Sequence, residues 1–403
     1  MKYILFIVSF FVACPSGMLH AQKQFKPVKA ALKSKNGTEA LKQVEELTKD
    51  SLLCEDPQLY DYGKEAQILI NNVENEKAYL KQSYDTAKFF NSTLGIYDYI
   101  LRCDVKEQQR LAKEGKKMKF VKGNQELLHR YYSNINAGAR YFYSKKQYAS
   151  AMPLLKHSIQ VPLLAIWGSN KSAIPYSNYQ RNAYLYLKSA YLSNNYSEVF
   201  TFKNFLLEDS NQYRCKALEY MSLSAEALKD SIAYYDYLKL GLKDYPQYPF
   251  FFTRWADYCA ERGDYQILVM ASDSLLQMDS TCVVFWEGKS LALLNLQRYE
   301  EAIETSKRCL MLDTTAVEAN YYVGAAYCSL AANIIMPTNI NSKAYKQAAA
   351  LRKKYYTLAL PYVENYRRLV PDAQKRWGPL LYSIYFSLNM GKKFEEIEQL
   401  MVK

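Results

Sequence analysis

Residues 286–327 read WEGKSLALLNLQRYEEAIETSKRCLMLDTTAVEANYYVGAAY. Apolar residues recur every three or four positions in this stretch, and the short segments QRY and DTT divide it into separate runs. That spacing puts the apolar side chains on one face of a helix. The stretch therefore predicts two amphipathic helices followed by the start of a third.

The same phrase returns along the chain at a constant interval. Small residues mark it at Ser222, Ala256, Ser290 and Gly324, which we call the small-residue column. A small side chain lets a neighbouring helix approach closely, so a repeated one marks a repeated helix crossing. The interval matches the period of about 34 residues that is typical of solenoids built from helix-turn-helix pairs. We therefore expect an all-α fold, an α-solenoid of antiparallel helix pairs.

The repeat carries marks of a known family. In the best-matched unit, the places that hold Trp, Tyr, Ala and Ala in the tetratricopeptide repeat are held by Trp286, Tyr299, Ala302 and Cys309. The chain departs from the pattern at Ser290, where glycine is usual, and at Thr314, where proline is usual. The sequence resembles the tetratricopeptide repeat family, and this resemblance implies a superhelix whose first helices line a concave groove.

The period also predicts the organisation of the chain. The array extends over residues 131–403, with insertions near residues 162–180 and 331–345, and one degenerate copy covers residues 184–206. Residues 22–130 are helical in period but match the repeat poorly, so we expect helical hairpins that are degenerate repeats.

Residues 1–21 read MKYILFIVSFFVACPSGMLHA. One early lysine, an apolar run over residues 3–13 and the small Ala21 predict a signal peptide cleaved after residue 21. The alternative is a lipid anchor on Cys14, because FVAC resembles a bacterial lipobox. The apolar run is shorter than the roughly 20 residues that span a bilayer, so we expect no transmembrane span in the mature chain. The leader resembles those of Bacteroidetes-type bacteria, which implies an exported protein of the periplasm or the outer-membrane periphery.

The chain has 52 Lys and Arg against 40 Asp and Glu, a formal net charge of +12. In an exported protein such an excess favours an anionic envelope surface over nucleic acid. Lysines concentrate in one run, and we define its candidate basic patch as Lys113, Lys116, Lys117 and Lys119. No aromatic residues interleave these charges, so single-stranded nucleic acid is not an expected partner. The alternative is a solvated helix end and loop.

The sequence carries no catalytic or phosphate-binding motif that we recognise, and no catalytic residue is predicted. Seven cysteines follow residue 21 without a C-x-x-C pair, and neither His129 nor His157 has an acid or cysteine at a spacing typical of metal sites. We therefore expect no metal and no cofactor, and we expect most cysteines to be buried as small apolar residues.

The resemblance also implies which side chains face the groove. Carrying the family's groove positions onto this sequence gives Glu219, Leu223, Phe250, Thr253, Asp257, Glu287, Leu291 and Tyr321. This mixture of apolar and acidic residues suits an apolar or basic partner segment. The alternative is that some of these side chains face water or pack between repeats.

These observations predict a non-catalytic protein-binding scaffold or adaptor of the bacterial cell envelope, with a protein or peptide as its partner. The alternative is an outer-membrane accessory protein that binds a nutrient or glycan. An enzyme is a third interpretation, which would require a site assembled from scattered residues.

Overall fold

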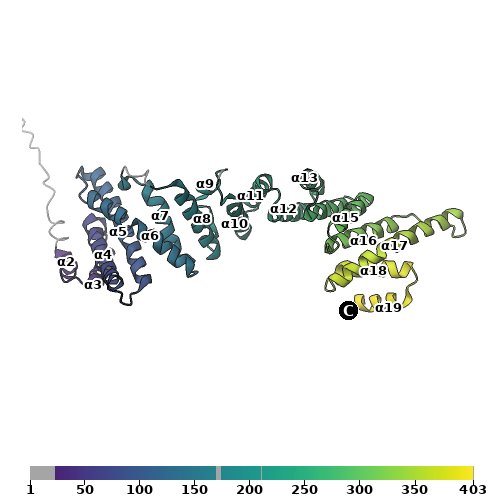
Figure 1. Ribbon diagram of the computed structural model, residues 1–403, viewed down its shortest axis with the longest axis horizontal. Helices are drawn as coiled ribbons and strands as arrows, with labels where there is room; N and C mark the ends of the chain where they lie inside the picture. Colours follow the sequence, from purple (N-terminus) through teal and green to yellow (C-terminus); the bar gives the residue numbers. More distant parts are fainter. Residues whose placement is uncertain (1–22, 169–173, 210, 403) are drawn as a thin grey trace, which may run out of the picture. The chain divides into compact units, whose positions relative to one another are not determined.

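A computed structural model of the chain describes residues 23–168, 174–209 and 211–402. All regular structure in these ranges is helical (Figure 1), so the predicted all-α fold is confirmed. No described helix is long and apolar enough to cross a membrane. The predicted signal peptide, with Cys14 and Ala21, lies outside the described residues. The chain divides into two compact units, residues 1–228 and 229–403.

The described part of unit 1 is a succession of helices in which each long helix packs against the next, from α2 to α8. The most extensive of these contacts joins α4 and α5, which form a hairpin. The elements of unit 1 are α2 (Lys26–Lys33), α3 (Gly37–Leu47), η1 (Leu53–Glu55), α4 (Pro57–Tyr79), α5 (Thr86–Glu114), α6 (Val121–Ser144), α7 (Tyr148–Gln160), η2 (Val161–Leu163), η3 (Ala165–Trp167), α8 (Tyr176–Leu192), η5 (Tyr196–Phe200), α9 (Lys203–Leu206) and α10 (Arg214–Ala227).

Unit 2 begins with the single helix α11 and continues as a stack of helix pairs, each a first helix followed by a second. Its elements are α11 (Ser231–Asp244), α12 (Pro249–Arg262), α13 (Tyr265–Met278), α14 (Val283–Asn295), α15 (Tyr299–Leu312), α16 (Val317–Ala332), α17 (Lys343–Leu369), α18 (Gln374–Ser387) and α19 (Gly391–Val402). Besides packing on its own second helix, each first helix contacts the next first helix, in the order α12, α14, α16, α18. The first helices therefore form one continuous layer, and unit 2 is an α-solenoid.

Helix boundaries in unit 2 repeat with the period found in the sequence. Three first helices begin at equal intervals, at Pro249, Val283 and Val317. Three second helices begin at the same interval, at Ser231, Tyr265 and Tyr299. The interval equals that of the small-residue column, so the sequence period is the period of the helix pairs.

The turn inside each pair has one recurrent backbone conformation. A residue with positive φ stands at Gly263 between α12 and α13, at Gln297 between α14 and α15, and at Lys229 just before α11, again one repeat apart. After α12, the N–H of Asp264 donates to the carbonyl of Cys259 at 2.8 Å, which satisfies a carbonyl at the helix end. Only one of these three residues is glycine. The left-handed conformation therefore results from the hydrogen bonds that end the helix, and not only from the presence of glycine.

The members of the small-residue column are all buried, at Ser222, Ala256, Ser290 and Gly324. At Gly324 a Cβ would lie 2.4 Å from Cγ2 of Val363 on α17. In the preceding first helix, a Cβ on Gly288 would lie 2.6 Å from the Phe252 ring of α12. The absence of side chains at these two positions lets α16 approach α17 and α14 approach α12.

One repeat differs from its prediction. The copy over residues 184–206 has the first helix α8, but its second helix is replaced by the 3-10 turn η5 and the four-residue helix α9. The segment SEVFTFKNFL contains β-branched and aromatic residues, Val199, Phe200, Thr201 and Phe202, that lose side-chain freedom in a helix. Phe202 and Val199 are buried instead as anchors of a compact turn.

Insertions are expected near residues 162–180 and 331–345. The turns η2 and η3 follow α7 within residues 161–168, and α8 already begins at Tyr176. Residues 333–342 connect α16 to α17. All seven described cysteines are free, and Cys103, Cys259, Cys309 and Cys328 are buried. Burial raises the pKa of the Cys309 and Cys328 thiols to about 12, which keeps them protonated and unreactive.

Candidate functional site

The first-helix layer of unit 2 carries six of the eight predicted groove residues. We call these six the first-helix face: Phe250, Thr253 and Asp257 on α12, Glu287 and Leu291 on α14, and Tyr321 on α16. Thr253 and Asp257 are exposed, and the other four are half-buried. Thr253, Glu287 and Tyr321 occupy the same position in successive repeats.

The other two predicted residues, Glu219 and Leu223, lie on α10 in unit 1. Both are half-buried, and the Glu219 carboxylate pairs with Lys216 at 2.8 Å. They are therefore described with unit 1, apart from the first-helix face.

One end of the first-helix face is occupied by an arginine. Arg376 of α18 donates to both carboxylate oxygens of Glu318 on α16, at 2.9 and 2.7 Å. Its guanidinium carbon lies 3.9 Å from the centroid of the Tyr321 ring. This combines a bidentate charge-assisted pair with a cation–π contact. The pair raises the pKa of Arg376 further above its ordinary value.

One repeat earlier, Glu287 is half-buried in a more acidic setting. Burial raises the pKa of the Glu287 carboxyl, and the nearby carboxylates of Glu318 and Asp313 raise it further. Among the described residues, no cation forms an ion pair with Glu287. A half-buried carboxylate with carboxylate neighbours is electrostatically suited to a cation supplied by a partner.

Sequence reasoning missed Glu318 and Arg376. Glu318 stands one repeat after Val284, which stands one repeat after the predicted Phe250, so extending that column would have found it. Arg376 follows the 333–342 connection and the 27-residue helix α17, which break the period. No repeat spacing could therefore have identified it.

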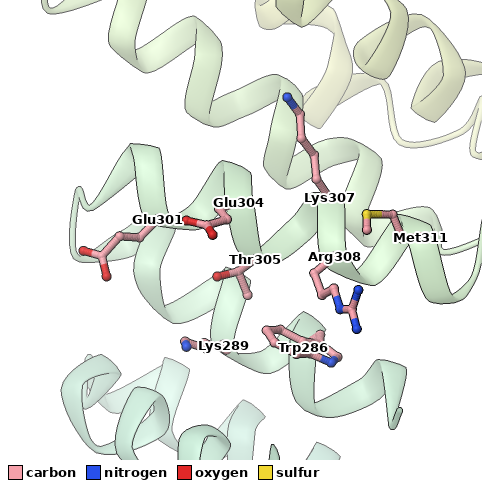
Figure 2. A pocket seen from close by; sticks show the side chains of 8 residues that line it. All are labelled: Trp286, Lys289, Glu301, Glu304, Thr305, Lys307, Arg308 and Met311. Atoms are coloured by element: carbon pink, nitrogen blue, oxygen red, sulfur yellow. The ribbon is translucent and has the colours of Figure 1, made fainter. Parts of the chain in front are cut away.

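A pocket of about 560 Å³ opens between α14 and α15 (Figure 2). We call it the Trp286 pocket, and it is lined by Trp286, Lys289, Glu301, Glu304, Thr305, Lys307, Arg308 and Met311. Figure 2 shows Arg308 beside the Trp286 ring, with Glu301 and Glu304 at the opposite end and the Lys307 side chain directed away. The indole N–H donates to the Ser280 carbonyl at 2.9 Å, which fixes the ring.

The charged groups of the Trp286 pocket differ in their pairing. Glu301 accepts from Arg298 at 2.7 and 2.5 Å, and Lys289 pairs with Asp273 at 2.7 Å. Arg308 and Glu304 are exposed, and neither forms an ion pair with another described residue. The pocket therefore offers an aromatic floor with donors and acceptors on its rim. From the sequence, Trp286 was predicted only as the residue that takes the Trp position of the repeat.

The predicted basic patch lies where α5 ends and α6 begins. Lys113 is in the last turn of α5, and the other three lysines stand in residues 115–120, which connect the two helices. All four side chains are exposed.

Candidate catalytic chemistry is sparse in the part of the chain that the structure describes. No group of three or more His, Cys, Asp or Glu residues there is placed to hold a metal ion. His157 does meet an acid that its sequence neighbourhood did not indicate, since its Nε2 lies 2.7 Å from Oδ1 of Asp98. His129 contacts the Trp167 carbonyl at 2.9 Å.

No protein-family model matches the chain, and no curated protein matches its sequence. Among solved structures, MamA MSR-1 C2 is 16% identical over 44% of this chain and 95% of its own, with a TM-score of 0.29. Yeast Tom70 is 11% identical over 89% of this chain and 97% of its own, with a TM-score of 0.30. The TPR2AB domain of yeast Sti1, in complex with pHSP90, is 11% identical over 74% and 95%, with a TM-score of 0.26. At these TM-scores the likeness carries no argument about function.

Proposed function

We propose that this chain is an exported scaffold of the tetratricopeptide type in a bacterial cell envelope, and that it binds a protein or peptide segment without catalysis. The bound segment lies on the first-helix face of unit 2, and the side chains of this partner segment are apolar and basic. The leader over residues 1–21 supports export, and the net charge of +12 favours an anionic envelope environment.

The observation that carries this proposal is the state of Glu287. Its carboxylate is half-buried, has carboxylate neighbours and forms no ion pair among the described residues, and its pKa is raised. The next acid along the same layer, Glu318, is already satisfied by Arg376 stacked on Tyr321. A lysine or arginine of a partner would do for Glu287 what Arg376 does for Glu318.

Apolar positions on the same layer would accept the rest of the segment. Phe250 and Leu291 are half-buried, so each presents apolar surface, and Leu291 stands one helical turn after Glu287. The Phe250 ring is contacted by Arg254 of its own helix, at 4.8 Å from the ring centroid. Binding at such a face depends on shape and exposed area distributed over several repeats.

A random peptide array probed with the full chain tests this proposal. We expect bound peptides to be enriched in Lys or Arg next to Leu, Ile or Phe, and we expect the variant Glu287→Gln to lose the preference for the cation. Glu304→Gln, on α15 in the same unit, is the matched control. Enrichment that is absent, or that both variants share with the wild type, would contradict the proposal.

A second candidate function, glycan binding, is favoured by the Trp286 pocket. A sugar ring presents C–H groups on its face and hydroxyls at its edge, which complements an indole floor, a rim of Arg308 and Glu304, and the buried hydroxyl of Thr305. Titration with envelope oligosaccharides would then change the tryptophan fluorescence, and Trp286→Phe would reduce that change. No change with any oligosaccharide would exclude this function.

A further inference from the structure

The basic patch is displayed by a loop that a buried carboxylate holds in place. Glu107 of α5 is only 1% exposed, and its two oxygens accept the backbone N–H groups of Lys119 at 2.5 Å and Phe120 at 2.9 Å. The Arg110 guanidinium lies 3.3 Å from the same carboxylate. Charge-assisted hydrogen bonds to a buried acid are strong, so the loop has a defined conformation at the end of the α4–α5 hairpin.

Positive charge on this loop exceeds the acids that meet it. Lys116 pairs with Glu114 at 2.6 Å. Lys113, Lys117 and Lys119 are exposed and form no ion pair with any other residue that the structure describes. Surplus cations at one end of a hairpin create a local positive potential that attracts an anionic partner.

An apolar side chain projects beside these lysines. Leu52, in the segment before α4, is 79% exposed. It lines a hollow of about 290 Å³ with Lys106, Lys113 and Lys116, and with the acids Glu55, Asp56 and Glu114. Lys106 pairs with Glu55, so Lys113 is the lysine of this hollow that forms no ion pair with another described residue. A projecting leucine beside Lys113, on the same helix end as the exposed Lys117 and Lys119, supplies the two requirements of a bilayer interface, an apolar group for the acyl boundary and cations for the headgroups.

We propose that Leu52 and the basic patch together form a docking surface for an anionic lipid bilayer. Leu52 enters the headgroup and acyl boundary, and Lys113, Lys116, Lys117 and Lys119 contact lipid phosphates. This surface belongs to unit 1, so it holds the scaffold at a membrane and leaves the first-helix face of unit 2 to its own partner.

Vesicle sedimentation of the full chain tests the proposal. The vesicles are phosphatidylcholine alone or an equal mixture of phosphatidylcholine and phosphatidylglycerol. Every variant keeps the same N-terminus, so any contribution of the N-terminus to binding is the same in all of them. Replacing the four lysines of the basic patch with Gln is expected to lower affinity for the mixed vesicles by about fivefold per lysine. The matched control removes the same charge from exposed lysines elsewhere in unit 1, at Lys33, Lys42, Lys145 and Lys203.

The variant Leu52→Ser separates the apolar contribution from the electrostatic one. We expect it to lower affinity for mixed vesicles by several-fold, with a loss that persists when added salt weakens the lysine contribution. Both sets of residues are exposed, so circular dichroism should show unchanged helix content. Equal binding to the two vesicle types, or equal losses in the patch variant and the dispersed-lysine control, would overturn the proposal. The proposal would also be overturned if the unmodified chain bound an acidic protein or nucleic acid but did not sediment with the mixed vesicles.

Discussion

Arg376 and Glu318 stand 58 residues apart in the sequence and form a bidentate pair at 2.9 and 2.7 Å on the first-helix layer. The guanidinium also covers the ring of Tyr321 at 3.9 Å. The chain therefore satisfies one acid of the first-helix layer with its own cation, while Glu287 on the same layer forms no ion pair with another described residue. The pair shows how this face accommodates a basic side chain.

Removing this internal cation should expose a second acidic position. Arg376→Ala leaves Glu318 without its partner and uncovers Tyr321, so the affinity for a basic, leucine-containing peptide should rise several-fold. Because both side chains are partly solvated, the free energy of unfolding should fall by only about 1 kcal/mol. Fluorescence anisotropy of the labelled peptide checks the affinity. Arg298→Ala, which breaks the bidentate pair with Glu301 away from the face, is the control and should leave affinity unchanged.

Glu287 should make stability depend on pH. Its pKa is raised in the folded chain, so the folded state holds the proton more tightly than the unfolded state. Ionised Glu287 therefore lowers stability at neutral pH, and this cost disappears as pH falls through the raised pKa. Glu287→Gln should be more stable than the wild type at pH 7 by less than about 1 kcal/mol, since the group is partly solvated. Urea unfolding of both proteins at several pH values checks this. A difference in the free energy of unfolding between Glu287→Gln and the wild type that grows toward acidic pH would contradict the raised pKa of Glu287.

The close approach of α16 to α17 should be sensitive to one methyl group. A Cβ on Gly324 would lie 2.4 Å from Cγ2 of Val363, so Gly324→Ala should destabilise unit 2 by about 1–3 kcal/mol despite the helix propensity gained. Adding Val363→Ala should recover part of the loss in a double-mutant cycle. Gly378→Ala is the control, because its Cβ would meet its neighbours at ordinary distances of 3.8 Å or more, and it should not destabilise.

The carboxylate beneath the basic patch should contribute to the stability of unit 1. Glu107→Gln removes the charge and one of the two acceptors that hold the N–H groups of Lys119 and Phe120, so unfolding should become easier by about 1–3 kcal/mol. Hydrogen exchange of these two amides should also accelerate. Glu114→Gln, an exposed neighbour, is the comparison and should change neither quantity measurably. Similar effects in both variants would show that the loop is not held by Glu107.

The sequence predicts the fold correctly wherever the repeat period is kept, and it fails where the period is broken. The constant repeat spacing predicted the helix pairs of unit 2, and the structure begins its helices at that spacing, as at Val283 and Val317. It could not predict that residues 196–206 form a 3-10 turn and a short helix, because packing of Val199 and Phe202 prevailed over the pattern.

For the candidate site, Glu287 and Tyr321 were predicted by carrying the family's groove positions onto this sequence, and they occupy equivalent places in successive repeats. Arg376 follows an irregular connection and comes to Tyr321 only through tertiary packing. The Trp286 pocket was missed because a conventional packing residue gave no sign that the space beside it would stay open. The Glu107 contacts were missed because they join a side chain to a backbone, which no residue pattern encodes.

Site-specific photocrosslinking tests most directly whether the first-helix face of unit 2 is the binding surface. A photoreactive amino acid is placed at Thr253 or Asp257 on α12, or at Ser274 or Gln277 on α13, all of which are exposed. After irradiation in native cell envelopes, we predict a discrete adduct from the two α12 positions that disappears when Glu287→Lys is added, and none from α13. Adducts formed equally from both helices, or unaffected by Glu287→Lys, would contradict the account.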